Sequence, residues 1–83
     1  MTKHIAIAVF DLATETYARP FFVAHPGQAI RSFMDELKNK DSELGKHPGD
    51  YDLFECGYFD DATGTFSAPP GPSRLLRGAD FKE

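Results

Sequence analysis

Two stretches of the chain, residues 17–37 (YARPFFVAHPGQAIRSFMDEL) and residues 47–66 (HPGDYDLFECGYFDDATGTF), decide the predicted fold. Each joins an extended run rich in aromatic residues to a group of turn-forming residues. The first stretch also contains an amphipathic helix that starts at Pro26, because proline suits the first helical turn. Its apolar residues form one stripe of that helix, at Ala29, Ile30, Phe33, Met34 and Leu37.

The beginning of the chain predicts a further strand over residues 4–10 (HIAIAVF), in which β-branched residues alternate with other residues. One side of this strand carries Ile5, Ile7 and Val9, and the other carries Ala6, Ala8 and Phe10. The small alanine side chains indicate a close neighbour on their side, such as the helix.

The remaining strands are bounded by proline and glycine. Pro20 cannot donate a hydrogen bond within a sheet, so the run over residues 17–24 is expected to be an edge strand or to begin near Phe21. Residues 50–59 predict another strand, in which Gly57 marks a bulge or a close backbone approach. Residues 60–64 (DDATG) predict a hairpin turn with Gly64 at positive φ, and residues 65–67 return as a short strand.

These elements predict an α+β fold in the order ββαββ, with a small antiparallel sheet and one helix on a face. Residues 1–68 form the predicted domain, and residues 41–48 are expected to be a polar loop within it. Residues 69–83 are a proline-rich breaker followed by a basic and apolar tail, which is either a docked segment or a mobile arm. No internal repeat is apparent in the sequence.

The size of the chain favours a homodimer. A single domain of 83 residues buries only about 60% of the surface that its unfolded chain exposes, and one cysteine offers no disulfide framework. Eight Phe and three Tyr are many large side chains for such a domain to bury. The face of the sheet without the helix would therefore expose aromatic rings unless a second copy covered it.

No residue pattern predicts catalysis, a metal site or a cofactor. His4, His25 and His47 lie in separate predicted elements, and four zinc ligands are not available. The acidic residues at positions 60–64 lack the ligand spacing of a calcium loop and fit a turn better. Cys56 has no basic neighbour in the sequence that would activate it. We therefore expect a protein that is not an enzyme.

Four arginines are the candidate contacts to nucleic acid: Arg19, Arg31, Arg74 and Arg77. The formal net charge of −4 argues against a basic groove-binding protein, so any contact depends on a local patch. Arginine beside exposed aromatic rings is typical of single-strand binding surfaces. Alternatively, Arg31 pairs with Asp35 on a solvated helix face, and Arg74 and Arg77 flank a docking peptide.

Five short motifs in this order resemble the small nonstructural protein of gokushovirus-type microviruses, which are single-stranded DNA phages. They are Val9-Phe10-Asp11, Arg19-Pro20-Phe21, Ala29-Ile30-Arg31-Ser32-Phe33, His47-Pro48-Gly49-Asp50-Tyr51-Asp52-Leu53 and Gly57-Tyr58-Phe59-Asp60-Asp61-Ala62-Thr63-Gly64. The resemblance covers most of the chain. The matching residues are mostly structural in type, and Arg31 is the charged position that it marks as functional.

The resemblance implies a counterpart of the C protein of φX-like phages, a non-enzymatic factor in the host cytoplasm. Such a factor acts in the switch from duplex genome replication to single-stranded DNA synthesis and packaging, through association with DNA. Alternatively, it is an adaptor that recruits the viral replication initiator or the procapsid without touching DNA, through a sheet edge or the tail. The longest apolar run, residues 5–10, is too short to span a membrane, and no signal peptide is apparent.

Overall fold

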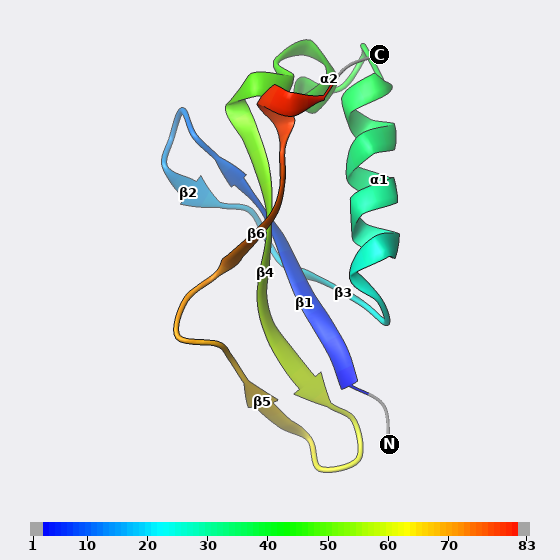
Figure 1. The fold of residues 1–83 in the computed structure, drawn as a ribbon, viewed down its shortest axis with the longest axis vertical. Helices are drawn as coiled ribbons and strands as arrows, with labels where there is room; N and C mark the ends of the chain where they lie inside the picture. Colours follow the sequence, from blue (N-terminus) through cyan, green and yellow to red (C-terminus); the bar gives the residue numbers. More distant parts are fainter. Residues whose placement is uncertain (1–2, 82–83) are drawn as a thin grey trace.

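The computed structural model describes residues 3–81, which form one antiparallel sheet with a helical layer on one face (Figure 1). Two long strands, β1 (Lys3–Asp11) and β4 (Tyr51–Asp60), pair along their whole length at the centre. The outer side of β1 pairs with β2 (Thr16–Tyr17) and β3 (Phe21–Val23). The outer side of β4 pairs with β5 (Thr65–Ser67) and β6 (Ser73–Arg77).

The helical layer consists of α1 (Pro26–Lys38) and the short α2 (Glu43–Lys46). Pro26 occupies the first turn of α1, and the side-chain oxygen of Gln28 accepts hydrogen bonds from the backbone N–H groups of Ala24 (3.0 Å) and His25 (3.1 Å). These contacts fix the start of the helix where the sequence predicts it. Short 3-10 turns, η1 (Pro48–Asp50) and η2 (Gly78–Asp80), precede β4 and follow β6.

The α+β class and the antiparallel sheet are confirmed, but the predicted order ββαββ is not found. Over residues 3–81 the order is three strands, two helices and three strands. The expected strand over residues 17–24 is divided at Pro20, which cannot donate to the sheet, so that β3 begins at Phe21. The expected polar loop over residues 41–48 contains α2, because the Ser42 hydroxyl accepts a hydrogen bond from the Gly45 N–H and caps one helical turn.

The segment after the proline-rich breaker is docked in the described part of the chain. Residues 73–77 form β6, which pairs with the first part of β4. The Gly78 N–H then donates to the buried carboxylate of Asp52 at 3.3 Å. Of the two alternatives that the sequence left open for this segment, the structure therefore shows the docked one.

The helix packs on the isoleucine side of β1, so the expectation that it covers the alanine side is wrong. Ile7 and Leu53 are fully buried, at 0% exposure, against the stripe of α1 made by Ala29, Phe33 and Leu37. Branched side chains have more apolar surface to bury beneath a helix than alanine has. Ala8 is also buried, but it lies on the opposite face, where its cross-strand partner is Phe54.

The bulge predicted near Gly57 is confirmed. Ala6 pairs with Gly57 and Ile7 pairs with Glu55, so Cys56 is the extra residue on β4. The close backbone approach is present as well, because a Cβ atom on Gly57 would lie 3.0 Å from the carbonyl oxygen of Ser67. Gly64 has the positive φ (71°) expected of it in the hairpin turn.

The sheet contains an internal repeat that the sequence analysis did not identify. Residues 9–20 (VFDLATETYARP) and residues 58–69 (YFDDATGTFSAP) are identical at six of twelve positions, which hold Phe, Asp, Ala, Thr, Thr and Pro. Each copy forms the end of a long strand, a turn, a short return strand and a break at proline. We call β1, β2 and β3 the first half of the sheet, and β4, β5 and β6 the second half.

The two turns repeat the same hydrogen bonds. In the first, the Asp11 carboxylate accepts from the Ala13 N–H at 2.9 Å, and the Asp11 carbonyl accepts from the Glu15 N–H at 2.8 Å. In the second, Asp60 accepts from Ala62 and Gly64 at the same two distances. Because β1 and β4 are antiparallel, an approximate twofold axis relates the two halves and places their turns at opposite ends of the sheet (Figure 1).

Candidate functional site

The face of the sheet that points away from α1, here called the open face, carries most of the exposed aromatic rings. Cross-strand partners lie on the same face of a sheet, so the register assigns residues to it. The pairs Phe10–Tyr17, Ala6–Phe22, His4–Phe59 and Phe59–Phe66 lie on the open face, as does Ala8–Phe54. The sequence predicted that aromatic rings would be exposed on the face without the helix, and this prediction is confirmed.

The rings form two clusters, one near each turn. The β2 cluster consists of Phe10, Tyr17 and Phe54, with ring centroids 4.7 Å apart for Phe10 and Tyr17 and 5.5 Å apart for Tyr17 and Phe54. The Tyr17–Phe54 contact is edge-to-face, which is a favourable arrangement for aromatic rings. Tyr17 remains 46% exposed and therefore presents part of its ring to solvent.

The β5 cluster consists of Phe22, Phe59 and Phe66. Phe59 lies 4.8 Å from Phe66 and 6.4 Å from Phe22, centroid to centroid. Phe66 is 73% exposed and Phe22 is 48% exposed. The two phenylalanines therefore offer more free ring surface than the β2 cluster does.

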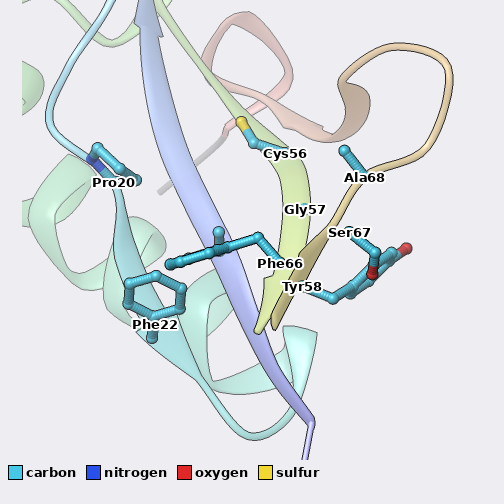
Figure 2. A pocket seen from close by; sticks show the side chains of 9 residues that line it. Pro20, Phe22, Cys56, Gly57, Tyr58, Phe66, Ser67 and Ala68 are labelled. Atoms are coloured by element: carbon cyan, nitrogen blue, oxygen red, sulfur yellow. The ribbon is translucent and has the colours of Figure 1, made fainter. Parts of the chain in front are cut away.

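A shallow hollow of about 440 Å³, here called the slot, lies on the open face beside the β5 cluster. Its walls include the rings of Phe22 and Phe66, and small residues line the rest of it, among them Ala6, Gly57 and Ala68. Figure 2 shows the Phe66 ring extending from β5 across β1 toward Phe22, with Pro20 near them and Tyr58 pointing away. The surface of the slot is mostly apolar.

Charged side chains are few on the open face of the strands. The register places Arg77 opposite Asp52 and Arg74 opposite Phe54. The Asp52 carboxylate is buried, and one oxygen lies 3.8 Å from the Arg74 guanidinium, while the other accepts the Gly78 N–H. The strands therefore place two arginines and one aspartate on this face, and the Asp61 carboxylate of the second turn reaches His4 on the same face.

The structure separates the four candidate arginines. Arg74 and Arg77 lie together on the open face, and Arg19 is exposed in the segment between β2 and β3, next to Pro20. Arg31 lies on α1, where it is exposed on the side away from the sheet because Ala29 and Phe33 face inward. Within residues 3–81 no ion pair joins Arg31 to Asp35.

His4, Cys56 and Tyr58 have surroundings that explain them as parts of the fold. The Asp61 carboxylate accepts a hydrogen bond from His4 Nε2 at 3.0 Å, and in residues 3–81 no group of three or more His, Cys, Asp or Glu side chains is arranged to hold a metal. Burial raises the pKa of the Cys56 thiol, which keeps the thiol protonated at neutral pH. The pKa of Tyr58 is raised by its hydrogen bond to Glu55, at 2.6 Å.

Both outer edges of the sheet are short and interrupted. The first edge is broken at Pro20 between β2 and β3, and the second is broken by residues 68–72 (APPGP) between β5 and β6. Proline cannot donate to an added strand, and short interrupted edges are a common way of preventing edge-to-edge pairing. These edges are therefore poor templates for a partner strand.

The sequence predicted arginines as the site and did not predict the aromatic residues. The rings that share the open face come from five strands, and only the register brings them together. The repeated Phe-Asp-x-Ala-Thr-x-Thr signal over residues 10–16 and 59–65 was available in the sequence. It would have placed Phe10 and Phe59, and then Tyr17 and Phe66, in equivalent positions.

Comparison with known proteins identifies a protein family. A family model described as Phage ORF5 protein matches residues 5–81, which is almost the whole chain. No curated protein and no solved structure matches the chain. No helix among the described residues is long and apolar enough to cross a membrane.

Proposed function

This chain belongs to the Phage ORF5 protein family, and on that premise we propose that it is a nonstructural regulatory factor of a single-stranded DNA phage. It acts in the host cytoplasm, in the switch from duplex genome replication to single-stranded DNA synthesis and packaging. It does so by binding single-stranded DNA on the open face. This role is the one that the resemblance to the gokushovirus protein implies, and the open face supplies a physical means for it.

The observation that supports this function most strongly is the arrangement of rings on the open face. Tyr17, Phe22 and Phe66 are all at least 46% exposed and lie on one surface. Unpaired bases stack on such rings, whereas the bases of a duplex are already stacked on one another. The open face is therefore suited to single strands, whose bases are free to stack on it.

The charge distribution allows this binding in spite of the acidic chain. Asp35, Glu36, Asp41 and Glu43 belong to the helical layer, on the other side of the sheet from the aromatic rings. Arg77 makes no ion pair among residues 3–81, so its charge is available to a phosphate. With so few cations, we expect binding of modest affinity that weakens with salt.

The adaptor alternative depends on an edge strand or on the tail as a docking segment. The edges are interrupted at proline, and β6 within the tail is already paired with β4. The tail is therefore not a free arm, and the edges open to an added strand among residues 3–81 are short and interrupted. This comparison favours the DNA-associated function over the adaptor.

Fluorescence anisotropy of labelled single-stranded and duplex oligonucleotides, measured across a salt series, tests the proposal. We expect saturable binding of the single strand that weakens with salt, and little binding of the duplex. Arg77→Gln should reduce the salt slope by about 0.7, the value for one phosphate contact on a single strand. The matched control is Arg31→Gln, which removes the same charge from the helical layer and should leave the binding unchanged.

Two results would contradict the proposal. Absence of single-strand binding at low salt would remove direct DNA contact and return the adaptor to first place. Equal losses in Arg31→Gln and Arg77→Gln would show that overall charge, and not the open face, controls the affinity.

A further inference from the structure

The slot lies where the open face changes from aromatic to small side chains. Ala6 and Gly57 are cross-strand partners, and they lie between the level of Phe54 and the level of Phe59 on β4. Both residues line the slot, together with Ala68 from the segment that follows β5. Because none of these three residues has a side chain larger than a methyl group, the region between the two aromatic clusters is hollow.

The walls of the slot present ring surface to whatever occupies it. Phe22 comes from β3 on one edge of the sheet and Phe66 comes from β5 on the other, and both are about half exposed or more. Figure 2 shows the two side chains directed toward each other over β1. A flat aromatic ring placed in the slot would stack against phenylalanine and contact the small residues.

Each half of the sheet has an arginine close to a residue of this region, and the Arg74 guanidinium also lies 3.8 Å from the Asp52 carboxylate. Arg19 immediately precedes Pro20, which lines the slot from the first half. Arg74 lies on β6, opposite Phe54. On the open face of β4, Phe54 is the residue next to Gly57. An occupant that combines a flat ring with anionic groups on both sides would be complementary to this arrangement, and a nucleotide within a strand has that chemistry.

We propose that the slot binds one unpaired nucleobase of a single strand, with the flanking phosphates directed toward Arg19 and Arg74. This inference rests on the proposed function and specifies the part of the open face that holds a base. Since the slot is lined mainly by apolar groups, it recognises the ring more than the hydrogen-bonding edge of the base. Binding is therefore tolerant of sequence and excludes paired bases.

The test fills the slot without removing an aromatic ring or a charge. Ala68 is exposed and lines the slot, so Ala68→Leu adds bulk there while Phe22, Phe66 and all arginines remain. The matched control is Ala13→Leu, the same change at an exposed position in the turn of the first half. We expect Ala68→Leu to weaken single-strand binding about tenfold with an unchanged salt slope, and the control to bind as the wild type does.

A second measurement on the unmodified protein uses an oligonucleotide with one 2-aminopurine, whose fluorescence falls when it stacks. Binding should quench this fluorescence in the wild type, and Ala68→Leu should restore it. The result is informative even if the leucine variant folds poorly, because the quenching is first observed without any substitution.

The outcomes separate the two proposals. Wild-type binding that survives in Ala68→Leu, with no quenching of 2-aminopurine, would overturn the slot as a base site and leave the proposed function standing. Loss of all single-strand binding in the wild type would overturn both. A dimer in sedimentation that Ala68→Leu dissociates, without any effect on DNA binding, would assign the slot to a second copy of the chain and overturn the proposal.

Discussion

The first and second halves of the sheet are two versions of one hairpin, and they differ in the segments to which that hairpin is connected. After the break at Pro20, the first half continues through the short β3 into α1, which covers the core. After residues 68–72, the second half continues into β6 and returns across the start of β4. The same local chemistry therefore produces the same turn twice, while the longer connections give the two ends of the sheet different surfaces.

The difference matters for the open face. The β2 cluster of the first half has Arg74 of β6 as a neighbour, because Arg74 lies opposite Phe54. The β5 cluster of the second half has Phe22 of β3 as a neighbour instead. Each cluster thus contains a ring from the other half, and the two arginines of β6 lie at the end of the open face that holds the β2 cluster.

The largest expected effect concerns the docking of β6 and η2 in the second half. A Cβ atom on Gly78 would lie 2.0 Å from the carbonyl oxygen of Pro48 and 2.3 Å from that of Tyr51. Both atoms belong to the backbone and cannot move away as a flexible side chain would. We expect Gly78→Ala to lower the free energy of unfolding by about 3 kcal/mol, measured by urea denaturation.

Gly71→Ala is the control for that substitution. A Cβ atom on Gly71 would have no heavy atom within 4 Å, and the residue lies in the segment that leads into β6. Its free energy of unfolding should match the wild type within error. If Gly78→Ala were equally harmless, β6 and η2 would not be docked as the structure shows, and residues 69–83 would be independent of the domain.

The next effect compares the exposed rings of the two clusters. Phe66→Ala should lower single-strand affinity about tenfold, because a stacked base contributes about 1–3 kcal/mol. Tyr17→Ala should have a smaller effect, since Tyr17 is 46% exposed and Phe66 is 73% exposed. Anisotropy at one fixed salt concentration gives both values, and a larger loss in Tyr17→Ala would place the main stacking surface in the first half.

A smaller effect, on the free energy of unfolding, is expected when the residue with positive φ in each turn is replaced by its counterpart from the other turn. This residue is Glu15 in the first turn, with φ of 58°, and Gly64 in the second, with φ of 71°. Side chains other than glycine lose about 1 kcal/mol in this conformation, so Gly64→Glu should destabilise by that amount. Glu15→Gly should stabilise by only about 0.5 kcal/mol, because glycine also gives the unfolded chain more freedom.

Thermal or urea unfolding of the two variants measures this exchange directly. Stabilisation by Gly64→Glu would mean that the turn of the second half does not require glycine. No change in either variant would show that the repeated hydrogen bonds of the aspartates alone determine both turns.

The sequence was sufficient for the elements whose signal is local. The stripe of Ala29, Phe33 and Leu37 predicted α1, and Gly64 and Gly57 marked the turn and the bulge correctly. It was not sufficient for the side of β1 on which the helix packs. Both sides of that strand are apolar, so periodicity alone did not distinguish Ile7 from Ala8 as a partner of the helix.

The candidate site was less accessible from the sequence because it depends on pairing between distant strands. Arg74 and Phe54 are partners across β4 and β6, and nothing near either residue in the sequence indicates that contact. The repeat over residues 9–20 and 58–69 was visible, but half of its positions differ, and its meaning becomes clear only when both copies form the same turn. Dimerisation through the open face stays a prediction.

The smallest expected effect concerns one more position at which the two halves differ, Val9 in the first and Tyr58 in the second. The Tyr58 hydroxyl donates to the Glu55 carboxylate at 2.6 Å, and this bond raises the tyrosine pKa above its ordinary value of 10.0. The folded state therefore holds the phenol proton more tightly than the unfolded state does. The stabilisation is complete below pH 10.0 and is lost as pH rises through the higher pKa of the folded state.

Urea denaturation at increasing pH measures this loss, with Tyr58→Phe as the comparison. Tyr51 contributes to the same alkaline loss in both proteins, because burial and then the nearby Asp11, Glu43 and Asp50 raise its pKa. The free energy of unfolding should therefore fall with pH in both, but less steeply in Tyr58→Phe. Identical slopes would show that the Tyr58–Glu55 hydrogen bond does not persist in solution. Tyr58 would then contribute no more to the pH dependence of stability than Val9 does at the equivalent position of the first half.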